Sequence, residues 1–100
     1  MAIEEVLDER QKTHGSFHQH ATIAQELKQV CRGKPEASPY PRWNALDNEY
    51  KEALDMILHK IARILAGDPN WVDHWTDIEG YAALGRKLAE KKGANDENLA

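Results

Sequence analysis

The sequence lacks several features that would place it in familiar classes. Cys31 is its only cysteine, so no disulfide can form within the chain. Its apolar runs stay far below the roughly 18 residues that predict a membrane-spanning helix. Its first residues include acids where a secretory signal would carry basic residues. We therefore expect a soluble protein of a reducing compartment, the cytoplasm.

A cluster of basic residues is also missing. The formal net charge is −4 over 100 residues and no run of Lys and Arg stands out, so binding to a nucleic acid backbone is not expected. A chain of this length supports one domain with a small core, and such a domain is only marginally stable alone. A homo-oligomer is therefore expected.

Helical periodicity is the dominant pattern in the chain. Apolar residues recur at helical spacing in four segments, and no alternation typical of strands occurs between them. Gly15, Gly33 and Gly67 are predicted to end the first three helices, and Ser16 and Asn44 to cap the second and third. The sequence therefore predicts an all-α fold, a small bundle of about four helices.

Two segments depart from this periodicity. Residues 34–43 hold three prolines with Tyr40 and Trp43, which predicts an ordered loop. Residues 94–100 hold no large apolar residue besides Leu99 and are predicted to form a flexible tail after a single helical domain over residues 1–93. The short connection at residues 67–70 predicts that the last two helices are antiparallel.

The third helix carries a polar stripe opposite its apolar face. At 100° per residue this stripe unites Asn48, Glu52, Asp55, His59 and Arg63. One interpretation is a solvated face whose charges pair one turn apart. The other interpretation is that its carboxylates contribute to a binding site.

The fourth helix is apolar on two sides, which predicts burial between neighbouring helices. Asp73 and Asp77 lie one turn apart near its start, and an acid at the edge of a packed surface needs a cation, a donor or a metal. Gly80 and Gly85 weaken the helix, and close helix packing would compensate. We expect an apolar stripe of this helix to be buried in a homodimer or higher oligomer.

The five histidines do not favour a zinc site. His14, His18 and His20 do not share one helical face, and Cys31 has no second cysteine to act with it. The carboxylates of Asp and Glu instead suit magnesium or manganese. Any metal is therefore expected to be Mg²⁺ or Mn²⁺.

Two segments together resemble a family of small all-helical proteins common in bacteriophages and prophages. The first segment carries Glu9-Arg10 and then His14-Gly15-Ser16-Phe17. The second runs from Glu52 as Glu-Ala-Leu-Asp-Met-Ile-Leu-His-Lys-Ile-Ala-Arg-Ile and resumes at Asp73 as Asp-His-Trp-Thr-Asp-Ile-Glu-Gly-Tyr-Ala. The second segment is also similar to the MazG-like, all-α nucleoside triphosphate pyrophosphohydrolases.

This resemblance implies catalytic and metal-binding roles for acids of the last two helices. It implies that Glu52 and Asp55 pair with Asp77, preceded by Asp73, to hold Mg²⁺ or Mn²⁺ against a nucleotide polyphosphate. His74 stands at the matching spacing where the enzymes prefer an acid. Carboxylates that share a metal should lie within roughly 4 to 6 Å of one another, and their clustering should raise at least one carboxyl pKa.

Substrate-binding residues follow from chemistry. Lys60 and Arg63 lie on the same helix as the first acid pair and could neutralise phosphate charge. Tyr81, Trp43 or Tyr40 could stack on a base. The function that the resemblance implies is that of a metal-dependent nucleotide-binding protein or nucleoside triphosphate pyrophosphohydrolase. The alternative is a non-catalytic phage accessory protein that binds and modulates a host protein through the proline loop and the fourth helix.

Overall fold

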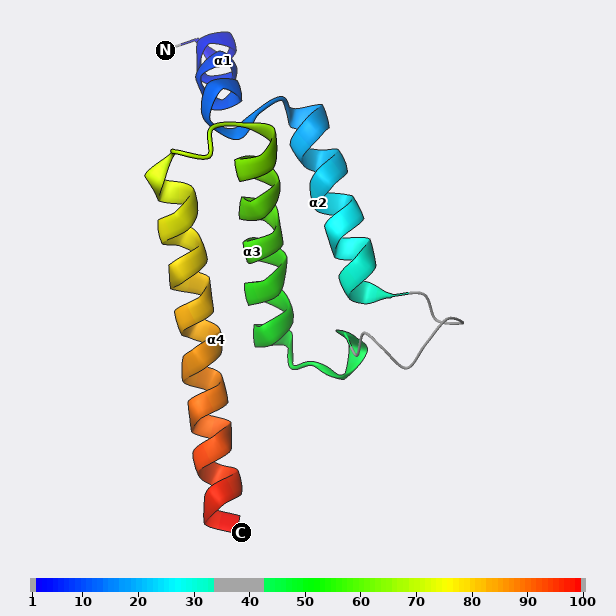
Figure 1. Ribbon diagram of the computed structural model, residues 1–100, viewed down its shortest axis with the longest axis vertical. Helices are drawn as coiled ribbons and strands as arrows, with labels where there is room; N and C mark the ends of the chain where they lie inside the picture. The colour runs from blue at the N-terminus through cyan, green and yellow to red at the C-terminus, as the bar shows by residue number, and fades with distance from the viewer. Residues whose placement is uncertain (1, 34–42, 100) are drawn as a thin grey trace.

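The computed structural model describes residues 2–33 and 43–99, with side chains described through Gly93. Within these ranges the chain is helical and contains no strand (Figure 1), which confirms the predicted all-α class. The helices are α1 (Ile3–His14), α2 (Phe17–Arg32), η1 (Trp43–Ala45, a 3₁₀ turn), α3 (Asn48–Ala66) and α4 (Val72–Leu99).

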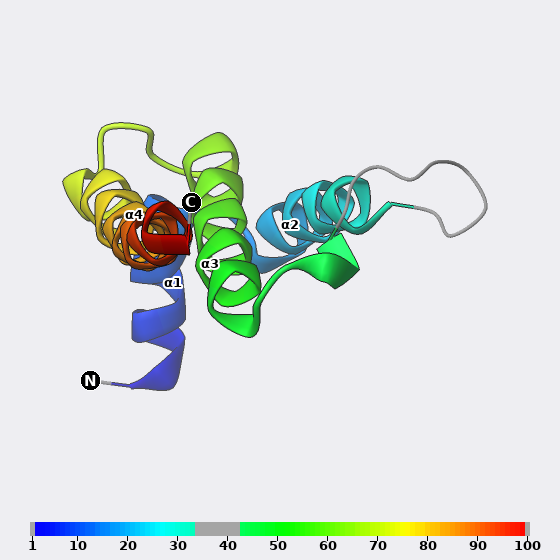
Figure 2. The ribbon, with the colours of Figure 1, turned by 90° about the horizontal axis from the view of Figure 1, so that it is seen from below.

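Three of the helices form a single layer with α3 in the middle. Helix α3 packs against α2 on one side and against α4 on the other. Helices α3 and α4 run in opposite directions, which confirms the predicted antiparallel pair. Helix α1 projects out of this layer near the α3–α4 turn (Figure 2) and contacts both α2 and α3. The fold is therefore an open layer with one corner covered by α1.

The helix ends follow the sequence at most positions. The Ser16 hydroxyl accepts a hydrogen bond from the Gln19 backbone N–H at 3.1 Å, as expected of an N-cap. Gly15 and Gly33 follow α1 and α2 with φ of 80° and 71°, a conformation that is nearly restricted to glycine. The expected Asn44 cap is wrong, because η1 intervenes and α3 begins after Asp47.

Two predictions fall at the edges of the described chain. The proline-rich segment lies outside the described residues, apart from Trp43. Helix α4 extends to Leu99, so the backbone of residues 94–99 is helical. The flexibility predicted for residues 94–100 and the domain boundary at residue 93 stay predictions.

Two interhelical turns cross in close contact and set the position of α1. A Cβ atom added to Gly15 would overlap the Ala66 backbone, and one added to Gly67 would overlap Thr13 O and the Gly15 backbone. The Asp68 N–H also donates to the Thr13 carbonyl at 3.0 Å. Glycine is required at both positions because the backbones approach too closely for a side chain.

The core of the described chain is small. Its buried apolar residues are Ala24, Trp43, Ala53 and Ala62, and the buried polar residues are His20 and His74. Ten large apolar side chains of the described residues are instead exposed, among them Phe17, Val72 and Trp75. No described helix is both long and apolar enough to cross a membrane.

Candidate functional site

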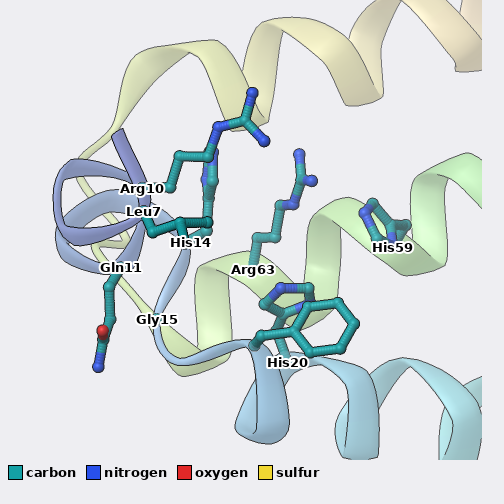
Figure 3. Close-up of a pocket in the computed structure, with 9 residues that line it drawn as sticks. Leu7, Arg10, Gln11, His14, Gly15, His20, His59 and Arg63 are labelled. Carbon is teal, nitrogen blue, oxygen red and sulfur yellow. The ribbon is translucent and has the colours of Figure 1, made fainter. Parts of the chain in front are cut away.

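A pocket lies at the corner where α1 meets α2 and α3 (Figure 3). Its volume is about 360 Å³, within the range of small-molecule sites. None of the described residues that line it is acidic, although the chain as a whole carries a net charge of −4. The residues that shape it include Leu7, Arg10, His14, His20, His59 and Arg63.

Helical spacing accounts for the arrangement of these side chains. Arg10 and His14 lie one turn apart on α1, and His59 and Arg63 lie one turn apart on α3, so each pair shares a helix face. The Gly15–Gly67 contact brings the end of α1 to the end of α3. The two pairs consequently line the same pocket, with His20 contributed by the first turns of α2.

Two guanidinium groups give the pocket its positive charge. The Arg10 and Arg63 side chains extend toward the same region in Figure 3. Burial lowers the pKa of Arg63, the nearby Arg10 charge lowers it further, and Asp77 opposes the shift. The guanidinium of arginine is a permanent cation in proteins. Two like charges at the same pocket would be stabilised by a bound anion.

Two nitrogens at the pocket have no hydrogen-bond partner among the described residues. They are Arg63 Nε and His20 Nδ1, and both atoms are buried. The His20 side chain is only 7% exposed, and its ring meets Phe17 and His59 edge to face. Buried polar groups in folded proteins are nearly always paired. These two atoms are therefore exceptions to that rule within the described chain.

The pocket histidines are neutral at physiological pH. Burial lowers the pKa of His14 to about 4, with further lowering by Arg63 and His74. Burial also lowers the pKa of His59 to about 4, followed by the effect of Arg63. The pKa of His20 is lowered in the same direction by burial and by Arg63. The imidazoles therefore offer hydrogen bonds rather than charge.

A histidine pair anchors α1 to the start of α4. His74 Nε2 lies 3.0 Å from the Thr13 carbonyl oxygen and 3.4 Å from His14 Nδ1. A carbonyl only accepts, so His74 Nε2 carries the hydrogen and His14 Nδ1 is left as an acceptor. His74 is 1% exposed. This residue, which stands at an expected acid position, orients the His14 ring at the pocket.

Asp77 is paired with a cation. Its carboxylate lies 2.9 Å from Lys60 Nζ. The hydrogen bond from Lys60 lowers the pKa of Asp77, and the charges of Lys60, His74 and Arg63 add to that effect. The raised carboxyl pKa expected of clustered acids is therefore not found at Asp77. The ion pair with Lys60 supplies the cation that Asp77 needs at the edge of the α3–α4 contact.

The other acids that were predicted to bind metal lie in different parts of the structure. Asp55 lies 3.5 Å from Arg32 of α2, whereas Glu52 lines a separate groove against Tyr81 of α4. Asp73 is exposed in the first turn of α4. Among the described residues, no three His, Cys, Asp or Glu side chains form a group that could hold a metal ion. The structure therefore does not bring three of the four predicted metal ligands into one site.

The predicted substrate-binding residues are also separated. Arg63 lines the pocket, but Lys60 is engaged with Asp77 and Tyr81 faces the α3–α4 groove. Trp43 is buried beneath Arg32, whose guanidinium carbon lies 5.7 Å from the ring centre, so this ring is covered by the protein itself. Tyr40 lies outside the described residues.

Sequence reasoning missed Arg10, His14 and His20 as parts of one pocket. The signal was the first of the two segments that resembled a family, Glu9-Arg10 followed by His14-Gly15-Ser16-Phe17. The polar stripe of α3 is also not simply solvated, because Asp55, His59 and Arg63 are half-buried and Asp55 pairs with α2. Both segments that carried the family resemblance, the one beginning at Glu9 and the one beginning at Glu52, contribute residues to this pocket.

A family model, Domain of unknown function (DUF6378), matches residues 1–89 of the chain. The chain belongs to this family. No curated protein and no solved structure matches it. The described residues that line the pocket run from Leu7 to Arg63, so the site lies wholly within the DUF6378 domain.

Proposed function

We propose that this DUF6378 protein binds a phosphorylated small molecule of the nucleotide class at the Arg10–Arg63 pocket. The observation that carries the proposal is the presence of two guanidinium groups in a pocket of an acidic protein, with no acid among the described residues that line it. Guanidinium groups bind phosphate through paired, charge-assisted hydrogen bonds.

The shape of the pocket supports a nucleotide rather than free phosphate. Phe17 lines its opening and is 78% exposed, with its ring held edge-on against His20 at 5.3 Å. An exposed aromatic ring beside a cationic pocket suits a base that stacks while its phosphate meets the arginines. In this arrangement Arg10 and Arg63 hold the phosphate and Phe17 contacts the base.

Hydrolysis by a MazG-like mechanism is a second candidate. It draws on the resemblance in the second segment and on the position of Asp77, whose charge acts on Arg63. Magnesium often reaches a protein on the substrate phosphates and needs only one or two carboxylates. In this candidate Asp77, released from Lys60, would hold the metal, and the metal would supply Lewis-acid chemistry at the phosphate.

Calorimetric titration with inorganic phosphate, AMP and ATP tests binding. Arg63→Met should weaken AMP binding by about tenfold or more, because a charge-assisted hydrogen bond contributes roughly 1.5 to 3 kcal/mol. Arg86→Met is the matched control, since Arg86 is exposed on α4 and pairs with Glu90 at 2.7 Å. Equal loss in both variants, or no binding by the wild type, would refute the proposal.

The base and the chemistry need separate measurements. Phe17→Ala should weaken AMP binding several-fold while leaving inorganic phosphate unaffected, because stacking contributes about 1 to 3 kcal/mol per base. Release of pyrophosphate from ATP with Mg²⁺ or Mn²⁺ would support the hydrolase candidate. Binding without release would leave the protein as a nucleotide-binding module.

A further inference from the structure

The apolar surface of α3 and α4 requires a partner. Among the described residues, no Leu, Ile, Val, Met or Phe side chain is buried in the single chain. Three helices in one layer cannot enclose a core, because each face of the layer needs a covering element. Five of the ten exposed large apolar side chains lie on α3 and α4, and none of these five lines the Arg10–Arg63 pocket.

A groove between α3 and α4 marks where the partner would lie. Its volume is about 390 Å³, it shares no described residue with the nucleotide pocket, and its lining is almost entirely apolar. Tyr50, Leu54 and Ile57 line one wall, and Ala82, Gly85 and Ala89 line the other. A Cβ atom added to Gly85 would meet nothing within 4 Å, so the floor is open to a close-packing helix.

The charges along α4 fit a second copy of this chain as the partner. Residues 72–79 carry Asp73, Asp77 and Glu79 with no Lys or Arg. Residues 86–92 carry Arg86, Lys87, Lys91 and Lys92 against the single acid Glu90. Asp77, Arg86 and Lys92 already form ion pairs within the chain, with Lys60, Glu90 and Asp47. The difference in sign between the two ends of α4 still favours an antiparallel over a parallel second copy.

The size of the side chains also differs between the two halves of α4, as their charge does. Trp71, Trp75 and Ile78 form the bulky half of the stripe, and Ala82, Gly85 and Ala89 form the small half. Trp75 is half exposed, while its indole N–H donates to the Pro69 carbonyl at 2.7 Å, so its ring is already fixed in place. An antiparallel copy sets bulky side chains against small ones, and a rigid aromatic anchor favours association.

We infer that two copies of this chain pair through the α3–α4 groove, with their α4 helices antiparallel and a two-fold axis near Ala82. Ala82 is equally distant in sequence from Trp75 and Ala89, so Trp75 meets the partner's Ala89. Glu79 then lies opposite the partner's Arg86. The two α3–α4 pairs form a four-helix arrangement that covers the apolar groove on both copies.

Cysteine cross-linking tests this geometry. In the full chain carrying Cys31→Ser, Ala82→Cys should oxidise to a disulfide-linked dimer, because a residue on the axis lies next to its own copy. Ala89→Cys is the matched control and should not link to itself, but it should link to Trp75→Cys when the two are mixed. Self-linking of both Ala82→Cys and Ala89→Cys would indicate parallel helices and overturn the inference. Linking by neither variant would also overturn it.

Glycine substitution gives an independent readout. Gly85→Ala adds a methyl group where one copy leaves open space, so it should shift the sedimentation equilibrium of the full chain toward monomer by about tenfold. Gly80→Ala is the control and should not shift the equilibrium. A Cβ atom added to Gly80 also meets nothing within 4 Å, but Gly80 does not line the groove. A wild-type monomer at high concentration would overturn the inference and leave this face for a different protein. Phosphate and AMP binding should be unchanged in both variants, which separates this test from that of the pocket.

Discussion

His74 Nε2 of α4 donates to the Thr13 carbonyl of α1 at 3.0 Å, across 61 positions of sequence. The same carbonyl accepts from the Asp68 N–H at 3.0 Å. One backbone oxygen at the end of α1 is thus held by both the turn before α4 and the first turn of α4 itself. These contacts fix the end of the helix that presents Arg10 and His14 to the pocket.

Replacing His74 should therefore loosen α1. His74→Ala removes a hydrogen bond and a fully buried ring, so we expect the free energy of unfolding to fall by about 2 to 4 kcal/mol. The Thr13 carbonyl keeps its bond from Asp68, which limits the loss. Urea denaturation measures the change. AMP binding measured below the transition should weaken too, and full affinity in a destabilised variant would contradict the anchoring role.

The close contact between the two turns predicts how glycine substitutions change the stability of the fold. Gly15→Ala meets the Ala66 backbone and requires a positive φ, so it should destabilise the fold by more than about 1 kcal/mol. Gly80→Ala, on an open helical surface, should stabilise it by about 0.5 to 1 kcal/mol. Thermal unfolding of both variants gives the comparison. Opposite signs are expected, and similar shifts would show that the turns are not in close contact.

The pocket histidines predict acid sensitivity. His14 and His59 have pKa values of about 4 in the folded chain, against 6.5 when unperturbed. The unfolded chain binds more protons between these values, so the free energy of unfolding should fall as pH drops from about 6.5 to about 4. Urea midpoints across this window measure the slope. The double variant His14→Gln with His59→Gln should flatten it, and an unchanged slope would exclude these groups as the cause.

The pocket should also bind anions more tightly in mild acid. A bound anion favours the charged imidazolium and therefore raises the pKa of His14 and His59. Sulfate affinity should consequently increase as pH falls from 7 toward 5, and sulfate keeps its double charge throughout this range. Calorimetry in buffers of different ionisation enthalpy would detect the accompanying proton uptake. Affinity that is independent of pH would place the anion away from these histidines.

Asp77→Asn separates phosphate binding from the magnesium hypothesis. The Asp77 carboxylate pairs with Lys60 and acts on Arg63, so its removal should make the pocket more positive and tighten phosphate binding in the absence of metal. A magnesium ligand would behave differently, because its loss should abolish Mg²⁺ binding and any hydrolysis. Asp73→Asn is the control, since it makes the same change of charge at an exposed position. Titration of both variants with phosphate and with Mg²⁺ distinguishes the two roles.

Local chemistry was sufficient to predict the helices. Ser16 caps α2, and Gly15 and Gly33 stand where α1 and α2 end, because capping and glycine conformations depend on a few neighbouring residues. The antiparallel α3–α4 pair followed from the short turn between them. The start of α3 could not be placed in the same way, because η1 changes where the helix can begin.

The pocket depended on tertiary structure. Helical spacing grouped Glu52, Asp55, His59 and Arg63 on one stripe, but it carried no information about which neighbour each would meet. The structure directs Asp55 to Arg32, Asp77 to Lys60 and Arg63 to the pocket. The sequence by itself determined the elements and their apolar faces. The crossing of the Gly15 and Gly67 turns decided which charged groups came together, because such long-range contacts depend on how the backbones pack and not on local spacing.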